Sequence, residues 1–201
     1  MEKLNPPEPG KYYHIYNRGN NRENIFFEER NYHYFMQLYA KYIEPVADTF
    51  AYCLMRNHFH LLLRLKTCRV SETRQVLELD AREIGQQFNN LFNSYAKAIN
   101  KAYNRTGSLF QKRFGRIEVT SDSYFSALIN YILRNPQKHG FVEDFRDYPY
   151  SSYHAMLSDR ATRLKREEVL AWFAGKERFE QFHGAAADTK PIEYLVVEDG
   201  D

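Results

Sequence analysis

Two histidines stand one residue apart at the head of an apolar segment, MRNHFHLLLRL, which spans residues 55 to 65. Alternate side chains of a β-strand point to the same face of a sheet, so His58 and His60 would lie side by side. Two imidazoles are too few for a structural zinc site, but they could supply part of an open catalytic site that takes one more ligand from elsewhere. Two surface or hydrogen-bonded histidines would give the same pattern, and a chain with seven histidines can produce such a pair by chance.

Residues 121–135, SDSYFSALINYILRN, are expected to form a helix that could bring further polar groups to the histidines. Tyr131 and Asn135 are four residues apart and therefore lie on one face of this helix, one turn from each other. Ser121 suits the start of the helix, and Pro136 is expected to end it after Asn135. Both Tyr131 and Asn135 also have structural interpretations, as a core aromatic residue and as a helix terminator.

The segments around these residues predict a mixed α+β domain. Arg56 and Asn57 are expected to form the turn of a hairpin between two strands. Strands are expected over 11–19, 46–55 and 58–65, an extended segment over 106–120, and helices over 29–43, 80–104, 121–135 and 166–182. This order favours an antiparallel sheet with packed helices and is compatible with a ferredoxin-like core.

Length and composition limit the classes of protein. The 201 residues predict one domain with an appendage, long enough to bury a sizeable core. No run approaches 18 apolar residues, and the opening MEKLNPPEPG has no apolar stretch, so we expect neither a membrane span nor a secretory signal. Cys53 and Cys68 are too few for a disulfide framework, and a reducing cytoplasm is expected.

Positive charge is concentrated in one part of the chain, although the formal net charge is only +2. No Asp or Glu occurs from Gly85 to Ile117, and such a patch indicates an anionic partner. Lys97, Lys101 and Arg105 repeat every four residues and would form a ridge that could follow the phosphates of a nucleic acid. An ordinary solvated helix face is the alternative interpretation.

Several motifs together resemble the single-tyrosine transposases of the insertion-sequence-200-like family, which carry a His-hydrophobe-His strand. AYCLMRNHFHLLLRL is similar to that strand, YYHIYNRGNNRENIF to the family's opening strand and turn, and GSLFQKRFGRIEV to its Gly-Leu-Phe-Gln segment. YILRNPQKHGFV is similar to the tyrosine helix, and YPYSSYHAML to the C-terminal signature of the branch called REP-associated tyrosine transposases. The resemblance runs in order through residue 157. We therefore expect a transposase domain over 1–157 and a C-terminal extension, partly helical with a loose tail, over 158–201.

This resemblance implies both a fold and a reaction. The fold is a ferredoxin-like antiparallel sheet with packed helices, and the reaction is the metal-dependent cutting and rejoining of single-stranded DNA that carries a hairpin. By position, Tyr131 is implied as the nucleophile that forms a 5′-phosphotyrosine, with His58, His60 and Asn135 as ligands of Mg²⁺ or Mn²⁺. The basic residues expected to contact the DNA are Arg18, Arg22, Lys97, Lys101, Arg105, Lys112, Arg113 and Arg116.

The sequence departs from the family pattern at Arg56, in the segment RNPQKHG, which is more basic than usual, and over residues 158–201, which the resemblance covers poorly. Arg56 stands where a proline is usual, and Asn135 stands where some members have the longer glutamine. Two other functions stay open: a DNA-binding protein on the same fold that does not cut, and a nicking enzyme of the rolling-circle type. The YPYSSY segment favours the transposase, and it favours a monomer over a dimer because the REP-associated branch tends to be monomeric.

Overall fold

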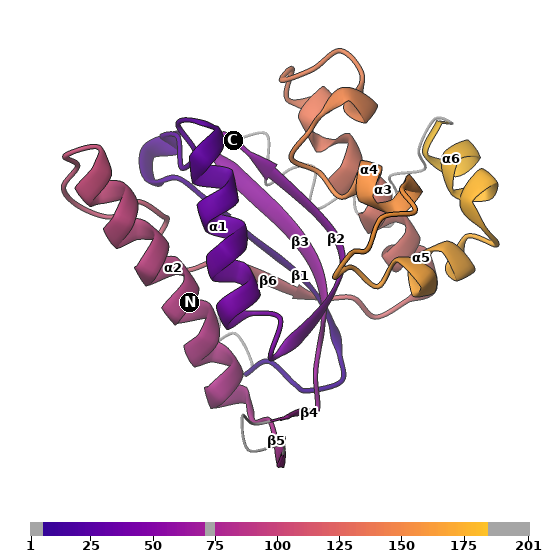
Figure 1. Ribbon diagram of the computed structural model, residues 1–201, viewed down its shortest axis with the longest axis horizontal. Coiled ribbons are helices and arrows are strands. Elements are labelled where there is room, and N and C mark those ends of the chain that lie inside the picture. The colour runs from indigo at the N-terminus through magenta and orange to yellow at the C-terminus, as the bar shows by residue number, and fades with distance from the viewer. Residues whose placement is uncertain (1–5, 71–74, 185–201) are drawn as a thin grey trace.

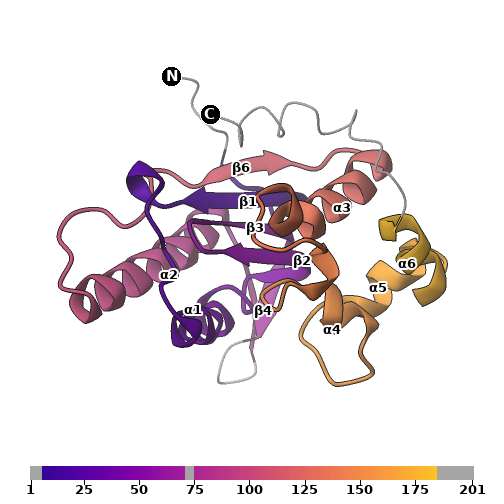
Figure 2. The same cartoon turned by 90° about the horizontal axis from the view of Figure 1, so that it is seen from above.

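Four antiparallel strands form the central sheet, in the order β2–β3–β1–β6. The computed structural model describes residues 6–70 and 75–184. The βαββαβ order, with β1 and β3 at the centre of the sheet, confirms the predicted ferredoxin-like fold (Figures 1 and 2). The elements of this core are β1 (Tyr12–Arg18), α1 (Glu29–Tyr42), β2 (Ala47–Met55), β3 (His58–Leu65), α2 (Ala81–Ala102) and β6 (Gly115–Glu118).

Local sequence explains where these elements begin and end. The side chain of Asp80 accepts a hydrogen bond from the Glu83 N–H and so caps the start of α2. Arg56 and Asn57 form the predicted turn of the β2–β3 hairpin, which brings Met55 opposite His58. A small hairpin that the sequence did not indicate, β4 (Cys68–Val70) and β5 (Val76–Glu78), precedes α2.

Helices cover both faces of the sheet (Figure 1). On one face α1 and α2 pack against the apolar side of β3, where Phe59, Leu61 and Leu63 are buried. On the other face α3 (Asp122–Lys138) packs against β2 and β3 around Leu62 and Cys53. The sequence indicated only the first of these cores. The second one places the histidine face of β3 inside the protein.

The expected end of α3 at Asn135 is wrong, because Pro136 lies inside the helix and α3 continues to Lys138. Proline lacks a backbone N–H, so near the end of a helix it removes one hydrogen bond without removing the last turn. The His139 N–H still donates to the Asn135 carbonyl and closes that turn. The extra turn brings Lys138 and His139 to the same end of the sheet as Tyr131.

The chain after α3 folds back over the second core. It forms a 3₁₀ turn, η2 (Phe145–Asp147), and a short α-helix, α4 (Tyr153–Leu157). Two further helices follow, α5 (Arg166–Trp172) and α6 (Lys176–Gly184). The single helix expected over 166–182 is wrong, because Ala174 and Gly175 have positive φ angles of 58° and 111° and separate two helices. Val169 and Phe179 are fully buried in the same core as α3.

The predicted division of the chain at residue 157 stays a prediction, and the expected loose tail lies beyond residue 184, outside the described residues. In the described part of the chain, no helix has the length and apolar character needed to cross a bilayer.

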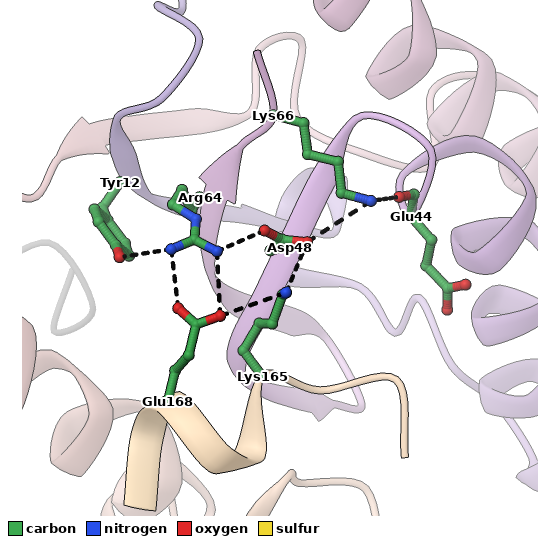
Figure 3. Close-up of polar contacts among 7 residues, drawn as sticks. All are labelled: Tyr12, Glu44, Asp48, Arg64, Lys66, Lys165 and Glu168. Atoms are coloured by element: carbon green, nitrogen blue, oxygen red, sulfur yellow. Dashed lines mark hydrogen bonds and ion pairs between the residues drawn. The ribbon is translucent and has the colours of Figure 1, made fainter. Parts of the chain in front are cut away.

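A charged cluster fastens the start of α5 to the end of the sheet (Figure 3). Arg64 of β3 donates to Asp48 of β2 at 2.8 Å and to Glu168 of α5 at 2.9 Å. Lys165 lies 3.4 Å from Glu168, and Lys66 joins the cluster through the Asp48 carboxylate, 3.7 Å away, while it also donates to the Glu44 carbonyl. Arg64 also donates to the Tyr12 hydroxyl, so one guanidinium links β1, β2 and α5.

Replacing Arg64 with Ala is expected to lower the free energy of unfolding by about 2 kcal/mol, because it leaves the mostly buried Asp48 carboxylate without its strongest partner. The measurement is urea denaturation followed by circular dichroism. Arg163→Ala is the matched control, since the Arg163–Glu44 ion pair is largely exposed and should contribute less than about 1 kcal/mol. Equal losses in the two variants would contradict the proposed fastening role of Arg64.

Candidate active site

The two histidines of β3 lie side by side between the sheet and α3. His58 and His60 are 3% and 2% exposed, and their ring centroids are 5.3 Å apart. The sheet register places Arg18 of β1 opposite His58 and Tyr16 opposite His60, so these four side chains share one face. The predicted alternation of β3 is therefore confirmed.

His58 is held in a defined orientation and protonation state. Its Nδ1 lies 2.7 Å from the Asn57 side-chain oxygen, which can only accept, so the ring proton is on Nδ1. Its other nitrogen, Nε2, is buried without a hydrogen-bond partner. Burial lowers the pKa of the His58 imidazole to about 3, with help from the positive charge around His139 and Arg18. At neutral pH His58 therefore presents an uncharged ring with a free lone pair.

His60 is oriented by a second histidine, His14 of β1. The His60 Nδ1 and the His14 Nε2 are 2.9 Å apart, and the two rings stack with centroids 5.1 Å apart. Burial lowers the pKa of His14 to about 3 and also lowers the pKa of His60 well below its ordinary value. Two uncharged rings can share this hydrogen bond only if one donates, and donation by His60 leaves the lone pair of its Nε2 for a ligand.

Helix α3 brings Tyr131 and Asn135 onto the same histidines. The Tyr131 ring packs edge-on against His60, with centroids 5.4 Å apart, and against His14 at 6.2 Å. Asn135 is completely buried, donates from Nδ2 to the Tyr131 carbonyl at 3.3 Å, and leaves its side-chain oxygen without a hydrogen-bond partner. Asn135 lies close enough to His58 to raise the pKa of that imidazole against the larger effect of burial.

Two basic side chains at the end of α3 complete the surroundings. The Lys138 ammonium lies 5.3 Å from the centre of the Tyr131 ring, where a positive charge stabilises negative charge that develops on the phenol oxygen. The His139 ring packs against His58, with centroids 4.7 Å apart. Burial lowers the pKa of both Lys138 and His139.

The uncharged ring nitrogens of His58 and His60 and the amide oxygen of Asn135 are donor types that suit a divalent metal ion. His58 and His60 are neutral, and Asn135 offers an amide oxygen that no protein donor satisfies. Across residues 6–70 and 75–184, no three His, Cys, Asp or Glu side chains cluster so that they could hold a metal ion. The Asn135 amide oxygen is a further uncharged oxygen donor close to His58. Imidazole nitrogens and an amide oxygen are donor types that bind divalent metal ions.

A cavity of about 330 Å³ opens in front of the histidines, lined by Tyr16, Asn17, Arg18, His58, His60, Gln111, Arg113 and Gly115. Tyr131 and Asn135 are not among the residues that line this cavity. The Tyr16 ring lies directly over Gly115 of β6, where a Cβ atom would come within 2.4 Å of the ring. Glycine at 115 is therefore needed for the Tyr16 ring to form the wall of this cavity.

Two further cavities continue from the first one along the segment between α2 and β6. One shares Asn17 and Gln111 with the histidine cavity and is lined by Lys97 and Lys112; the next is lined by Lys112, Arg113 and Arg116. We call these three adjoining cavities the basic groove. Five of the eight predicted DNA contacts line it: Arg18, Lys97, Lys112, Arg113 and Arg116.

The other three predicted contacts lie outside the basic groove. Arg105 forms an ion pair with Glu23, which offsets part of its charge, and its guanidinium lies over the Phe27 ring. Lys101 is exposed in the last turn of α2, and Arg22 is exposed in the 3₁₀ turn η1 (Asn20–Arg22).

Sequence reasoning missed the residues that hold the candidate ligands in place. His14 shares its strand face with Tyr16 and Arg18, but only the register of β1 against β3 shows that this face meets the histidines. Asn57 looked like a turn residue, and its adjacency to His58 was the only available signal. Lys138 and His139 were placed beyond the helix because Pro136 was expected to end it.

A curated protein and a solved structure are similar to this chain, whereas no family model matches it. A curated protein from Haemophilus influenzae named as a REP-associated tyrosine transposase is 31% identical over 113 residues, which cover 53% of this chain and 59% of that protein. A solved structure, described as a REP-associated tyrosine transposase bound to a REP hairpin, superimposes with a TM-score of 0.60 at 16% identity. That match covers 79% of this chain and 87% of the other and shows a shared fold. In sequence and in fold, the chain therefore resembles the REP-associated tyrosine transposases, as its motifs indicated.

Proposed function

We propose that this protein cuts and rejoins single-stranded DNA through a covalent bond to Tyr131, with a divalent metal ion held by His58, His60 and Asn135. The observation that carries the proposal is the packing of Tyr131 against His60, with the buried Asn135 one helical turn further on and next to His58. A nucleophile and three uncharged metal ligands of the right types thus lie together. The similarity to REP-associated tyrosine transposases supports the same reaction.

In the proposed reaction, the Tyr131 oxygen attacks a DNA phosphorus as a phenolate. A bond forms between that oxygen and phosphorus, the bond from phosphorus to the 3′ oxygen breaks, and the released 3′ oxygen takes up a proton. The product is a 5′-phosphotyrosine and a free 3′-OH. A bound metal ion would polarise the scissile phosphate and stabilise its developing charge.

The remaining side chains position these groups. Asn57 and His14 fix the orientations of His58 and His60, while the Lys138 ammonium favours negative charge on the Tyr131 oxygen. Rejoining reverses the first step: a 3′-OH attacks the phosphotyrosine and releases the Tyr131 oxygen. Because the phosphotyrosine bond retains the free energy of the broken phosphodiester bond, rejoining needs no nucleoside triphosphate.

We further propose that the protein acts as a monomer in the cytoplasm on strands that carry a hairpin. Tyr131 packs against His60 of the same chain, so one chain contains every group that the reaction needs. The solved structure that shares this fold is described as bound to a REP hairpin, and this supports a hairpin substrate for the present chain. The experiment is a cleavage assay on hairpin-bearing single strands with Mn²⁺, Mg²⁺ or a chelator. A covalent protein–DNA product that requires the metal is expected, and DNA binding without cleavage would favour the non-cutting alternative.

The orientation of His60 gives a prediction about metal affinity. His14→Ala removes the hydrogen-bond partner of the His60 Nδ1 and should weaken Mn²⁺ binding by about 10- to 100-fold, the usual effect of losing an outer-shell partner. Calorimetric titration with Mn²⁺ measures this. His33→Ala is the matched control, since His33 is exposed on α1 and should leave the affinity unchanged. Unchanged Mn²⁺ affinity in His14→Ala would show that His14 does not orient a ligand.

The basic groove gives a prediction about salt dependence. Replacing Lys97, Lys112 and Arg113 with Gln should flatten the slope of log affinity against log salt by about 2, because each phosphate contact on a single strand contributes about 0.7. Binding titrations over a range of salt concentrations measure it. Lys101→Gln is the control on the same helix, outside the groove, and should leave the slope unaltered. If Lys101→Gln changes the slope as much as Lys97→Gln alone, the strand follows the helix ridge instead of the groove.

A further inference from the structure

The cavity in front of the histidines contains a second tyrosine, whose hydroxyl has no part in the reaction described above. Tyr16 of β1 lies opposite His60 in the sheet register and lines this cavity, whereas Tyr131 does not line it. Tyr16 is only half-buried, so a molecule that enters the cavity can reach it. A strand bound here would therefore touch Tyr16 as well as the histidines.

Three neighbours hold the Tyr16 ring in one place. It stacks on the His14 ring, with centroids 4.9 Å apart and planes at 28°, and less closely on His60, with centroids 6.0 Å apart. On β6, Gly115 has no side chain, and a Cβ atom there would come within 2.4 Å of Cζ, Cε1 and Cε2 of Tyr16. Stacked rings and a close backbone leave the Tyr16 ring little room to turn. The ring is thus positioned before any ligand binds.

The hydroxyl end of the Tyr16 ring lies at the cavity. Cζ carries the hydroxyl, and Cε1 and Cε2 adjoin Cζ, so the contact with Gly115 places this end of the ring over β6. Gly115 itself lines the cavity, together with Gln111 and Arg113 from the segment that leads into β6. The fold therefore offers an O–H donor in the same cavity as the candidate metal ligands.

The charged groups around this hydroxyl suit a phosphate. The described residues that line the cavity include two arginines, Arg18 and Arg113, and no carboxylate. Arg18 and Tyr16 are alternate residues of β1, so their side chains lie on one face of the sheet. Guanidinium groups without acidic neighbours attract an anion, and a hydroxyl donor adds a hydrogen bond to one of its oxygens.

We propose that Tyr16 is a catalytic residue whose hydroxyl donates a hydrogen bond to a non-bridging oxygen of the phosphate that Tyr131 attacks. As the Tyr131 oxygen bonds to phosphorus, negative charge grows on the non-bridging oxygens. A fixed O–H donor stabilises this charge more than it stabilises the ground state. Tyr16 keeps its proton and takes no part in making or breaking bonds. The inference rests on the proposed function and adds a donor to which the resemblance gives no role.

The test compares the wild type with Tyr16→Phe, which keeps the stacked ring and removes only the hydroxyl oxygen. Single-turnover cleavage of a hairpin-bearing strand with Mn²⁺ should slow by about 10- to 100-fold, the usual effect of losing one hydrogen bond to a charged transition state. Mn²⁺ affinity from calorimetry, and DNA affinity without metal, should stay within about twofold of the wild type, because the hydroxyl acts in the transition state.

Tyr12→Phe is the matched control. Tyr12 lies on the same face of β1 as Tyr16 but at the far end of the strand, where its hydroxyl accepts a hydrogen bond from Arg64. This variant should keep the wild-type cleavage rate.

A strand with one sulfur in the cleaved phosphate shows whether the hydroxyl touches that phosphate. The cleaved position is taken from the wild-type product, and each non-bridging oxygen is replaced in turn. Sulfur is a weak hydrogen-bond acceptor. One of the two isomers should therefore lose about tenfold more rate in the wild type than in Tyr16→Phe, where this hydrogen bond is already absent.

Three results would overturn the proposal: cleavage by Tyr16→Phe within about twofold of the wild type, an equal effect of sulfur in both proteins for each isomer, or a loss of Mn²⁺ or DNA affinity as large as the loss of cleavage. Wild-type cutting is measured in the same assay. A failure of the proposed cutting reaction would therefore appear in the wild type, whereas a failure of the role of Tyr16 would appear only in the comparison with Tyr16→Phe.

Discussion

Tyr131→Phe is expected to abolish covalent attachment of DNA and to reduce strand cleavage by at least about a thousandfold, as expected when a nucleophile is removed. The change deletes one oxygen and keeps the ring that packs against His60 and His14. The free energy of unfolding should therefore change by less than about 1.5 kcal/mol. DNA binding should stay close to the wild-type value, because the basic groove does not include Tyr131.

Tyr124→Phe is the control for this substitution. Tyr124 is a buried tyrosine of the same helix, two turns before Tyr131, and its loss of a hydroxyl should leave the covalent product intact. Covalent product is detected as a shifted band on denaturing gels after incubation with a labelled hairpin-bearing strand. A shifted band that persists in Tyr131→Phe and disappears in Tyr124→Phe would move the nucleophile to Tyr124.

The second large effect is expected at the paired histidines. Replacing His58 and His60 together with Ala removes two of the three proposed ligands and should weaken Mn²⁺ binding by more than the 10- to 100-fold expected for an outer-shell residue. Cleavage should be lost with it. Calorimetric titration with Mn²⁺ is the measurement, and binding that persists unchanged would show that the metal site lies elsewhere.

The burial of both histidines complicates this variant. The two rings are almost fully buried, so Ala leaves space behind α3 and should lower the free energy of unfolding by about 1–3 kcal/mol. His58→Gln and His60→Gln are the companion variants, since they keep most of the volume and replace the imidazole. They should fold and still bind Mn²⁺ more weakly than the wild type, and wild-type affinity in both would contradict the assigned ligands.

The sequence could predict the parts of the site that depend on local periodicity. The alternation of β3 placed His58, His60 and Arg64 on one face, and helical spacing placed Tyr131 and Asn135 one turn apart. Whether that helix meets that strand depends on packing across the sheet, which no spacing within either segment reveals. The resemblance supplied this connection.

Other features needed the three-dimensional structure because they depend on pairing between distant segments. The hydrogen bond between His14 and His60 follows from the register of β1 against β3. The attachment of the segment after α2 follows from the hydrogen bond between Asn100 and the Gly107 carbonyl and from those that join this segment to the end of β1. The last turn of α3 was missed because proline is a statistical terminator. In α3, Pro136 removes only one backbone hydrogen bond, and the burial of the helix outweighs that loss.

Mass spectrometry of the covalent product tests the central claim most directly. The full chain is incubated with a hairpin-bearing single strand and Mn²⁺, the DNA is trimmed with nuclease, and the modified peptide is sequenced. We expect a nucleotide joined through its 5′ phosphate to Tyr131, formed with Mn²⁺ and not with a chelator. A nucleotide on any other residue, or equal modification of Tyr131 in the presence of the chelator, would contradict the proposed metal-dependent reaction.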